Sequence, residues 1–253
     1  MRTNYDKIAD TYDCNSFRNK SVDKNLIDFI ETYKKPLDSL NILDLGCGTG
    51  NQLVANKKKF PQVKMTGLDK FNGMLNVARK KSSDITWVRG SSDRTDFSHE
   101  EFDYITSQFS YHHMPNKKLF AKEVSRIIKK SGWFVVSNID VFQMKDWVIY
   151  RFFPEAWAID QEDFLELNEL ETLFENEGFS RVQLNQNRID LKMTIRKLFE
   201  SVKRRDSVSQ LQAISDKSFE NGVKNLKDFM EKNNSLEWLE PIVVFNLILK
   251  KNI

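Results

Sequence analysis

The chain concentrates glycine in one short loop. Gly46, Gly48 and Gly50 follow an apolar stretch that ends at Asp44, and an amphipathic stretch comes after them. Glycines between a strand and a helix let backbone amides and the helix N-terminus lie close to a bound ligand. The next apolar stretch ends at Asp69, nineteen residues beyond Gly50, where a carboxylate can accept both hydroxyls of a ribose. The loop and the spaced acid together predict a nucleoside-binding site.

The form of this loop distinguishes between nucleosides. A dinucleotide fold needs G-x-G-x-x-G, in which the third glycine lets the helix pack closely beside a pyrophosphate. Here the loop reads GCGTG after Asp44, so a pyrophosphate would meet a negative charge. A tight turn that happens to be rich in glycine is the structural alternative, and the flanking elements and Asp69 disfavour it.

The elements that must position this loop follow an alternating pattern. From residue 41 onward, short apolar stretches alternate with amphipathic ones, which predicts a parallel sheet covered by helices. The expected strands are residues 41–44, 63–68, 85–88, 102–107, 132–139, 181–190 and 242–249. The expected core helices are residues 52–58, 73–80 and 117–128, preceded by one helix with apolar positions from Tyr5 to Tyr12 and another over 26–33.

The chain after residue 140 has a different composition. Residues 146–177 are strongly acidic and residues 181–205 strongly basic, a pattern typical of solvated faces. About 50 residues separate the last two expected strands, too many for a structureless loop. Apolar spacing predicts helices over 194–205 and 216–231 in this gap, the second with Ser215 as its N-cap.

Composition excludes several classes of protein. Lys+Arg 39 against Asp+Glu 36 gives a net charge of +3, too even to indicate a nucleic-acid or membrane-surface protein. Neither a membrane-spanning stretch nor an apolar leader is present, so we expect a cytoplasmic protein without a membrane partner. Two cysteines and three histidines predict neither a disulfide scaffold nor a metal site.

Several segments resemble one family. Residues 42–50 read ILDLGCGTG, which resembles the first motif of the class I S-adenosylmethionine-dependent methyltransferases, in their small-molecule branch. The resemblance continues through TGLDKFNGML (66–75), WVRGSSDRTDF (87–97), FDYITSQFSYHHMPN (102–116) and GWFVVSNID (132–140), with YDKIADTYD near the start. It implies an α/β fold with a doubly wound, seven-stranded, mostly parallel sheet, and a final strand that is antiparallel.

The resemblance also implies an organisation and a reaction. Residues 1–140 would form the cofactor-binding core, and residues 141–253 would add the last two strands with a substrate-covering helical insertion, within one structural domain. The cofactor would be S-adenosyl-L-methionine, with S-adenosyl-L-homocysteine as product. The methyl group would move by direct in-line transfer to an O, N, S or C nucleophile of a small molecule.

The cofactor-binding residues follow from the same resemblance. Asp44 would orient the loop and help bind the methionine ammonium, Asp69 would hold the ribose hydroxyls, and Gln108 would lie near the sulfonium. Close backbone would come from the loop, namely from Gly46, Cys47, Gly48 and Gly50. The adenine would lie beside Lys70, Met74 and Ser92, with either Ser91 or Asp93 meeting its exocyclic amine.

The acceptor side is less determined by the sequence. His112 could accept the acceptor's proton. The structural alternative is that one histidine of the pair His112 and His113 is packed and the other is exposed. Five aromatic residues lie between Trp147 and Trp157, more than a solvent-facing connection would carry. We expect the acceptor to contact Tyr12, Trp147, Phe153 and Arg204. Arg196 and Arg205 are other candidates for binding an anionic group of the acceptor. The alternative for the aromatic residues is that they only pack the insertion onto the core.

Two other functions stay open at this point. An RNA methyltransferase would use the basic runs at residues 57–59 and 203–205, although the even net charge disfavours a nucleic-acid partner. A non-catalytic protein that binds S-adenosylmethionine would lack an acceptor site. A nicotinamide-dependent dehydrogenase is disfavoured by the glycine spacing and by Asp44.

Overall fold

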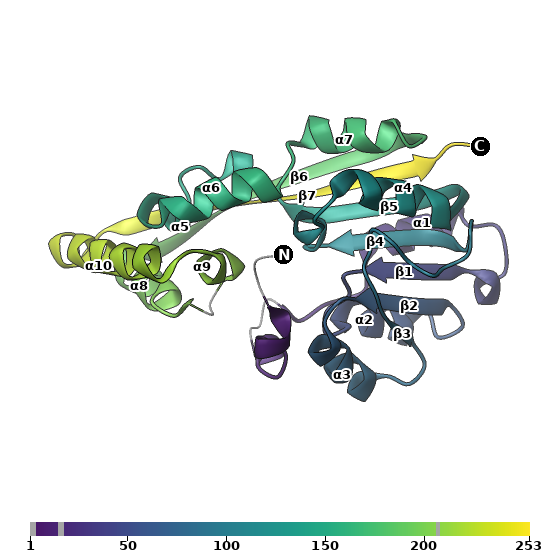
Figure 1. The fold of residues 1–253 in the computed structure, drawn as a ribbon, viewed down its shortest axis with the longest axis horizontal. Coiled ribbons are helices and arrows are strands. Elements are labelled where there is room, and N and C mark those ends of the chain that lie inside the picture. The colour runs from purple at the N-terminus through teal and green to yellow at the C-terminus, as the bar shows by residue number, and fades with distance from the viewer. Residues whose placement is uncertain (1–3, 15–17, 206–207) are drawn as a thin grey trace.

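The computed structural model describes residues 4–14, 18–205 and 208–253. Within these residues the chain builds one seven-stranded sheet with the order β3-β2-β1-β4-β5-β7-β6 (Figure 1). The strands are β1 (Asn41–Leu45), β2 (Lys64–Asp69), β3 (Thr86–Arg89), β4 (Phe102–Gln108), β5 (Ile128–Ile139), β6 (Phe179–Thr194) and β7 (Glu237–Lys251). Strands β1 to β5 pair in parallel, and β7 is antiparallel to both β5 and β6. The predicted fold class is therefore confirmed.

Helices cover both faces of this sheet. They are α1 (Lys24–Thr32), α2 (Asn51–Lys59), α3 (Asn72–Lys81), α4 (Lys117–Ile127), α5 (Val148–Phe152), α6 (Pro154–Asp163), α7 (Leu167–Glu175), α8 (Ile195–Val202), α9 (Ser209–Ala213) and α10 (Asp216–Lys232). Leu26, Leu53 and Leu75 bring α1, α2 and α3 into one buried cluster with the sheet. Val124 and Phe174 bring α4 and α7 into a second cluster. These two layers fix the strand ends between them.

Local sequence explains where several helices begin. The Asp23 carboxylate accepts a hydrogen bond from the Asn25 amide at the start of α1. Ser215 caps α10 through the Ser218 amide, as the sequence predicts. The one helix expected between Tyr5 and Tyr12 is wrong, because the chain instead forms two short 3-10 helices, η1 (Tyr5–Ile8) and η2 (Tyr12–Cys14). Contacts of these tyrosines with the rest of the molecule outweigh the helical spacing.

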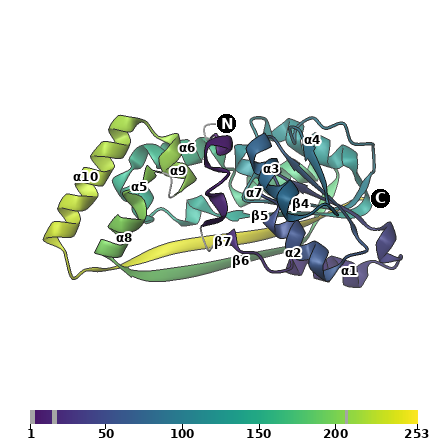
Figure 2. The same cartoon turned by 90° about the horizontal axis from the view of Figure 1, so that it is seen from below.

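The last two strands form a ribbon that extends beyond the sheet (Figure 2). Strand β5 pairs with β7 only from Val244 to Lys250, so the rest of β7 pairs with β6 alone. The insertion between the strands carries α8, α9 and α10, in the place that the sequence predicts. These helices contact α5 and α6, which the sequence analysis does not identify as helices. We call α5, α6, α8, α9 and α10 the lid; the N-terminal 3-10 helices lie between the lid and the sheet edge (Figure 1).

Candidate functional site

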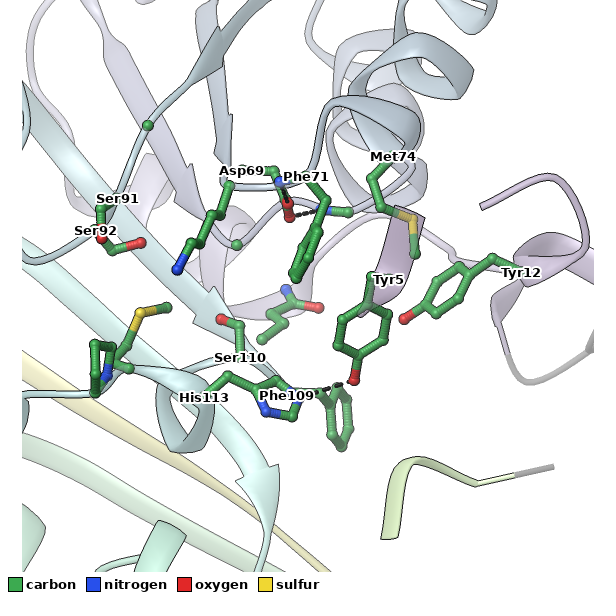
Figure 3. A pocket seen from close by; sticks show the side chains of 17 residues that line it. Tyr5, Tyr12, Asp69, Phe71, Met74, Ser91, Ser92, Phe109, Ser110 and His113 are labelled. Carbon is green, nitrogen blue, oxygen red and sulfur yellow. Dashed lines mark hydrogen bonds between the residues drawn. The ribbon is translucent and has the colours of Figure 1, made fainter. Parts of the chain in front are cut away.

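A cavity lies where β1, β2 and β4 end (Figure 3). In an α/β sheet, ligands bind outside the carboxyl ends of the strands, where neighbouring connections diverge. We call this the glycine-loop cavity. Its described lining residues are Tyr5, Tyr12, Gly46, Gly48, Asp69, Lys70, Phe71, Met74, Gly90, Ser91, Ser92, Gln108, Phe109, Ser110, His113, Met114 and Pro115.

Asp69 joins the ends of two neighbouring strands. Its Oδ2 accepts a hydrogen bond from the Gly48 amide and its Oδ1 one from the Phe71 amide, each at 2.8 Å. Burial raises the pKa of this carboxyl, and the backbone hydrogen bonds oppose the rise. A carboxylate offers about four acceptor positions, so each oxygen can still accept a hydroxyl. The side chain is thus held rigidly at the cavity wall with acceptor capacity left over.

The glycine loop has a backbone that side chains would disturb. Gly46 has a φ of +78°, and a Cβ atom there would lie 2.5 Å from the Cβ atom of Ser110. The amides of Gly46 and Cys47 both donate to the Leu68 carbonyl, which ties the loop to β2. Cys47 is buried away from the cavity, and burial raises the pKa of its thiol. The loop therefore presents backbone to the cavity and no nucleophile.

Asp44 lies behind the loop, on the α1 side of the sheet. It is only 3% exposed, and its Oδ1 has no hydrogen-bond partner among the described residues. Burial raises the pKa of this carboxyl to about 7, the Asp23 charge adds to the rise, and Lys20 opposes it. A buried carboxylate without a full set of partners is costly. An ammonium group beside Oδ1 would compensate this charge, but Asp44 is not among the described residues that line the glycine-loop cavity.

The connection after β3 brings two of its three candidates to the cavity. Ser91 and Ser92 line the cavity, whereas Asp93 accepts a hydrogen bond from the Ser91 hydroxyl and is not among the lining residues. Asp93 is thus placed to orient Ser91.

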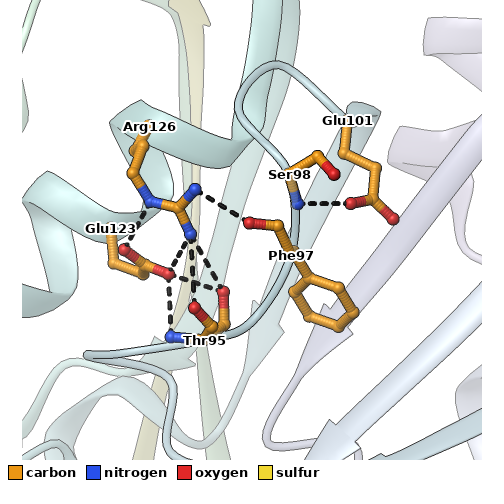
Figure 4. Close-up of polar contacts among 6 residues, drawn as sticks. All are labelled: Thr95, Phe97, Ser98, Glu101, Glu123 and Arg126. Carbon is orange, nitrogen blue, oxygen red and sulfur yellow. Dashed lines mark hydrogen bonds and ion pairs between the residues drawn. The ribbon is translucent and has the colours of Figure 1, made fainter.

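A polar cluster holds the same connection against α4 (Figure 4). The Glu123 carboxylate accepts a hydrogen bond from the Thr95 amide at 2.8 Å and pairs with Arg126, which donates to the Phe97 carbonyl. Hydrogen bonds from Arg126 and Thr95 outweigh partial burial and lower the pKa of Glu123 to about 2. The charged cluster fixes the chain that carries Ser91.

The two adjacent histidines have different surroundings, although their ring centroids lie only 3.9 Å apart. His112 is buried, with its Nδ1 2.9 Å from Asn138 Nδ2 and its ring stacked on Phe164. His113 lines the cavity instead, and its Nε2 lies 2.8 Å from the Tyr5 hydroxyl oxygen. Burial lowers the pKa of His113 to about 4, so the ring is neutral near pH 7. His112, which the sequence analysis predicts to face the acceptor, therefore does not line the glycine-loop cavity, whereas His113 does.

A second cavity lies between the N-terminal 3-10 helices and the lid. We call it the lid cavity; it has a volume of about 700 Å³, and Tyr5 and Tyr12 line both cavities. Trp147 and Arg204 line it, as expected for residues that contact an acceptor. Phe153 reaches neither cavity, because it is fully buried against Gly222 and Phe219 within the lid. For Phe153 the packing alternative holds.

The remaining arginine candidates have partners inside the lid. Arg196 donates to the Asn234 side chain, and Arg205 pairs with Asp216. Several lining residues were not among the site residues predicted from the sequence, for example Tyr5, Phe71 and Ser110. Tyr5 had a visible signal in its apolar spacing with Tyr12, but that signal indicated a helix face and not a cavity wall.

Within the described residues, no group of three or more His, Cys, Asp or Glu side chains could hold a metal ion. Nor does any helix of the described segments have the length and apolar character needed to cross a membrane.

Comparison with known proteins agrees with this geometry. Residues 42–132 match the sequence model of a methyltransferase domain. The chain is 27% identical over 157 residues to a demethylmenaquinone methyltransferase of Thermotoga maritima, covering 61% of this chain and 69% of the relative. It is 28% identical over 207 residues to the protein of the same name from Staphylococcus carnosus, covering 73% of this chain and 83% of the relative.

Solved structures show the same fold. A putative methyltransferase from Bacillus halodurans superposes with a TM-score of 0.63 at 17% identity, covering 91% of this chain and all of that one. Phosphoethanolamine N-methyltransferase 2 from Haemonchus contortus, in complex with S-adenosyl-L-methionine, superposes with a TM-score of 0.55 at 16% identity, covering 99% and 60%. With the motif and the sequence relatives, these findings define the class: the chain is a class I S-adenosylmethionine-dependent methyltransferase. None of these matches favours the RNA or non-catalytic alternative.

Proposed function

We propose that the glycine-loop cavity binds S-adenosyl-L-methionine and that the lid cavity binds the small-molecule acceptor. The observation that carries this proposal is Asp69, a carboxylate held at the cavity wall by two backbone amides with acceptor positions left for a ribose. The acceptor would reach the cofactor at the shared wall formed by Tyr5 and Tyr12.

The residues present fit the parts of this cofactor. The unpartnered Oδ1 of Asp44 suits the methionine ammonium, and Gln108, which lines the cavity, would lie near the sulfonium. Gly46, Gly48 and Gly50 keep side chains out of the loop, with Cys47 contributing backbone only. Lys70, Met74, Ser91 and Ser92 would surround the adenine, with Ser91 oriented by Asp93.

The reaction needs mainly alignment. S-adenosylmethionine supplies a methyl group that is already activated on a sulfonium. The chain's own task is to hold the acceptor nucleophile in line and to exclude water, and such positioning can contribute about 7 to 11 kcal/mol. The lid and the N-terminal 3-10 helices would enclose the acceptor for this purpose.

Tyr5 and His113 would remove the acceptor's proton. The Tyr5 oxygen faces both cavities and would accept that proton while its own proton passes to Nε2 of His113, 2.8 Å away. At a pKa of about 4 the His113 imidazole is neutral near pH 7 but a weak base, so it would take the proton only as methyl transfer makes the acceptor atom acidic.

The test is calorimetric binding of S-adenosyl-L-homocysteine, followed by methyl-transfer assays. Asp69→Ala should lower the affinity at least about tenfold, because hydrogen bonds to a charged group contribute about 1.5 to 3 kcal/mol each. Asp96→Ala, an exposed acid in the connection after β3, is the matched control. Unchanged binding by Asp69→Ala would overturn the site, and binding of NADH without S-adenosylhomocysteine would overturn the cofactor.

Acceptors for the transfer assay would include phenols, amines, carboxylic acids and demethylmenaquinone, the substrate in the relatives' names. We keep the division into residues 1–140 and 141–253, the cytoplasmic location and the lack of a nucleic-acid partner as predictions.

A further inference from the structure

One side of the lid cavity is apolar. It is formed by Trp147, which precedes α5, by Val148 and Ile149 of α5, and by Leu198 and Val202 of α8. A cavity of about 700 Å³ lies within the range of typical small-molecule sites. These walls suit an acceptor with an aromatic or aliphatic body.

Arg18 is a cation in this wall without a carboxylate partner. Among the described residues, none of the carboxylates lies within ion-pair distance of its guanidinium, although the side chain is half-buried. Its Cζ lies 4.2 Å from the centroid of the Tyr12 ring, so the stacked ring fixes its place. Its charge acts on both Tyr5 and Tyr12, which places it near the junction of the two cavities.

The two carboxylates that line the lid cavity, Glu200 and Glu240, have other partners than Arg18. Glu200 pairs with Lys203 on the same helix. The Glu240 carboxyl accepts a hydrogen bond from the Val148 amide, and burial raises its pKa to about 7, so it carries only a partial charge near neutral pH. Neither Glu200 nor Glu240 therefore pairs directly with Arg18.

We propose that the acceptor carries an anionic group, a carboxylate or a phosphate, which Arg18 binds at the junction while the apolar body packs against α5 and α8. This inference rests on the proposed function, since it assigns the acceptor to the lid cavity. A guanidinium offers a planar fork of donors that matches either anion. The methionyl carboxylate of the cofactor has the same chemistry, but Arg18 lines the lid cavity and not the glycine-loop cavity.

The first arm of the test separates these two sources of anion. Calorimetry would compare S-adenosylhomocysteine, which has the carboxylate, with 5′-methylthioadenosine, which lacks it. Arg18→Met should bind both with the wild-type affinity, within about threefold. A loss for S-adenosylhomocysteine alone would assign Arg18 to the cofactor and overturn the inference. Failure of the wild-type protein to bind S-adenosylhomocysteine would instead overturn the proposed function.

The second arm measures acceptor binding without turnover. Protein saturated with S-adenosylhomocysteine would be titrated with pairs of acids and amides: 3,4-dihydroxybenzoate and its amide, indole-3-acetate and its amide, and octanoate and its amide. At least one acid should bind about tenfold or more tighter than its amide, as expected for charge-assisted hydrogen bonds. Arg18→Met should abolish this preference for the acid. Arg18→Lys should keep part of the preference, and this second variant provides the test if Arg18→Met does not fold.

Arg196→Met is the matched control, because Arg196 is an arginine of the lid that lines neither cavity and donates to Asn234. It should keep the preference for the acid. Equal binding of acid and amide, binding of neither, or a preference that survives in Arg18→Met would each overturn the inference.

Discussion

We expect Asp44 to couple the stability of the protein to binding of the proposed cofactor. Burial, with the Asp23 charge in support, raises its pKa from 3.8 to about 7. A carboxyl with a raised folded-state pKa favours folding while protonated, so its contribution is lost as pH rises from the unfolded value through the folded one. We therefore expect Asp44→Asn to remove a pH dependence of stability from the cofactor-free protein.

The size of the effect follows from linkage. A rise of the Asp44 pKa from 3.8 to about 7 lowers the free energy of unfolding by about 4 kcal/mol in total by alkaline pH. About 2.5 kcal/mol of this loss falls between about pH 5 and about pH 8. The wild-type free energy of unfolding should fall by that much more than the variant's over this range. Urea unfolding at several pH values measures the difference, with Asp96→Asn as an exposed control.

Ligand binding supplies the second half of this test. Saturating S-adenosylhomocysteine should reduce the extra pH dependence of the wild type, because an ammonium beside Asp44 stabilises the ionised form. The variant should bind this ligand at least about tenfold more weakly, through loss of a charge-assisted contact. Parallel pH profiles for wild type and Asp44→Asn, with equal affinities, would refute the reasoning.

Three further predictions concern other parts of the molecule. Gly222→Ala should lower the unfolding free energy by about 1 to 3 kcal/mol, because its Cβ would lie 2.2 Å from the Phe153 ring, and this outweighs the better helix propensity of Ala. Calorimetry should show unchanged affinity for S-adenosylhomocysteine, and an equal loss of both properties would contradict a separate role for the lid. Glu123→Gln should lower stability by about 1 to 2 kcal/mol at pH 7. That deficit should shrink in thermal melts as pH falls below the ordinary 4.5 toward the folded pKa of about 2, and a deficit independent of pH would argue against the charged cluster. Tyr5→Phe should slow methyl transfer about 100-fold or more with cofactor affinity intact, and His113→Gln added to it should cost little more. Tyr33→Phe is the control tyrosine, and fully additive losses would contradict the proton path.

Local sequence was sufficient to predict the loop and the acid that meet at the glycine-loop cavity. The loop at residues 46–50 and Asp69 could be found because strand, glycine loop and helix follow one another directly in the chain. The sheet and the site of the insertion followed from the resemblance and from the length of chain between the last two strands. Each of these features depends on neighbours in the sequence or on a repeating period.

The tertiary structure decided the acceptor side. Tyr5 and His113 are 108 positions apart in the chain, and only the docking of the N-terminal 3-10 helices brings them together. Which of two adjacent histidines faces the cavity depends on the backbone of the turn at Tyr111–His113, where a change of a few dihedral angles exchanges a buried direction for an open one. Phe153 lies in the lid core because Gly222, on a distant helix, leaves room for its ring. Such positions are set by packing between segments far apart in sequence, which spacing and composition along the chain do not encode.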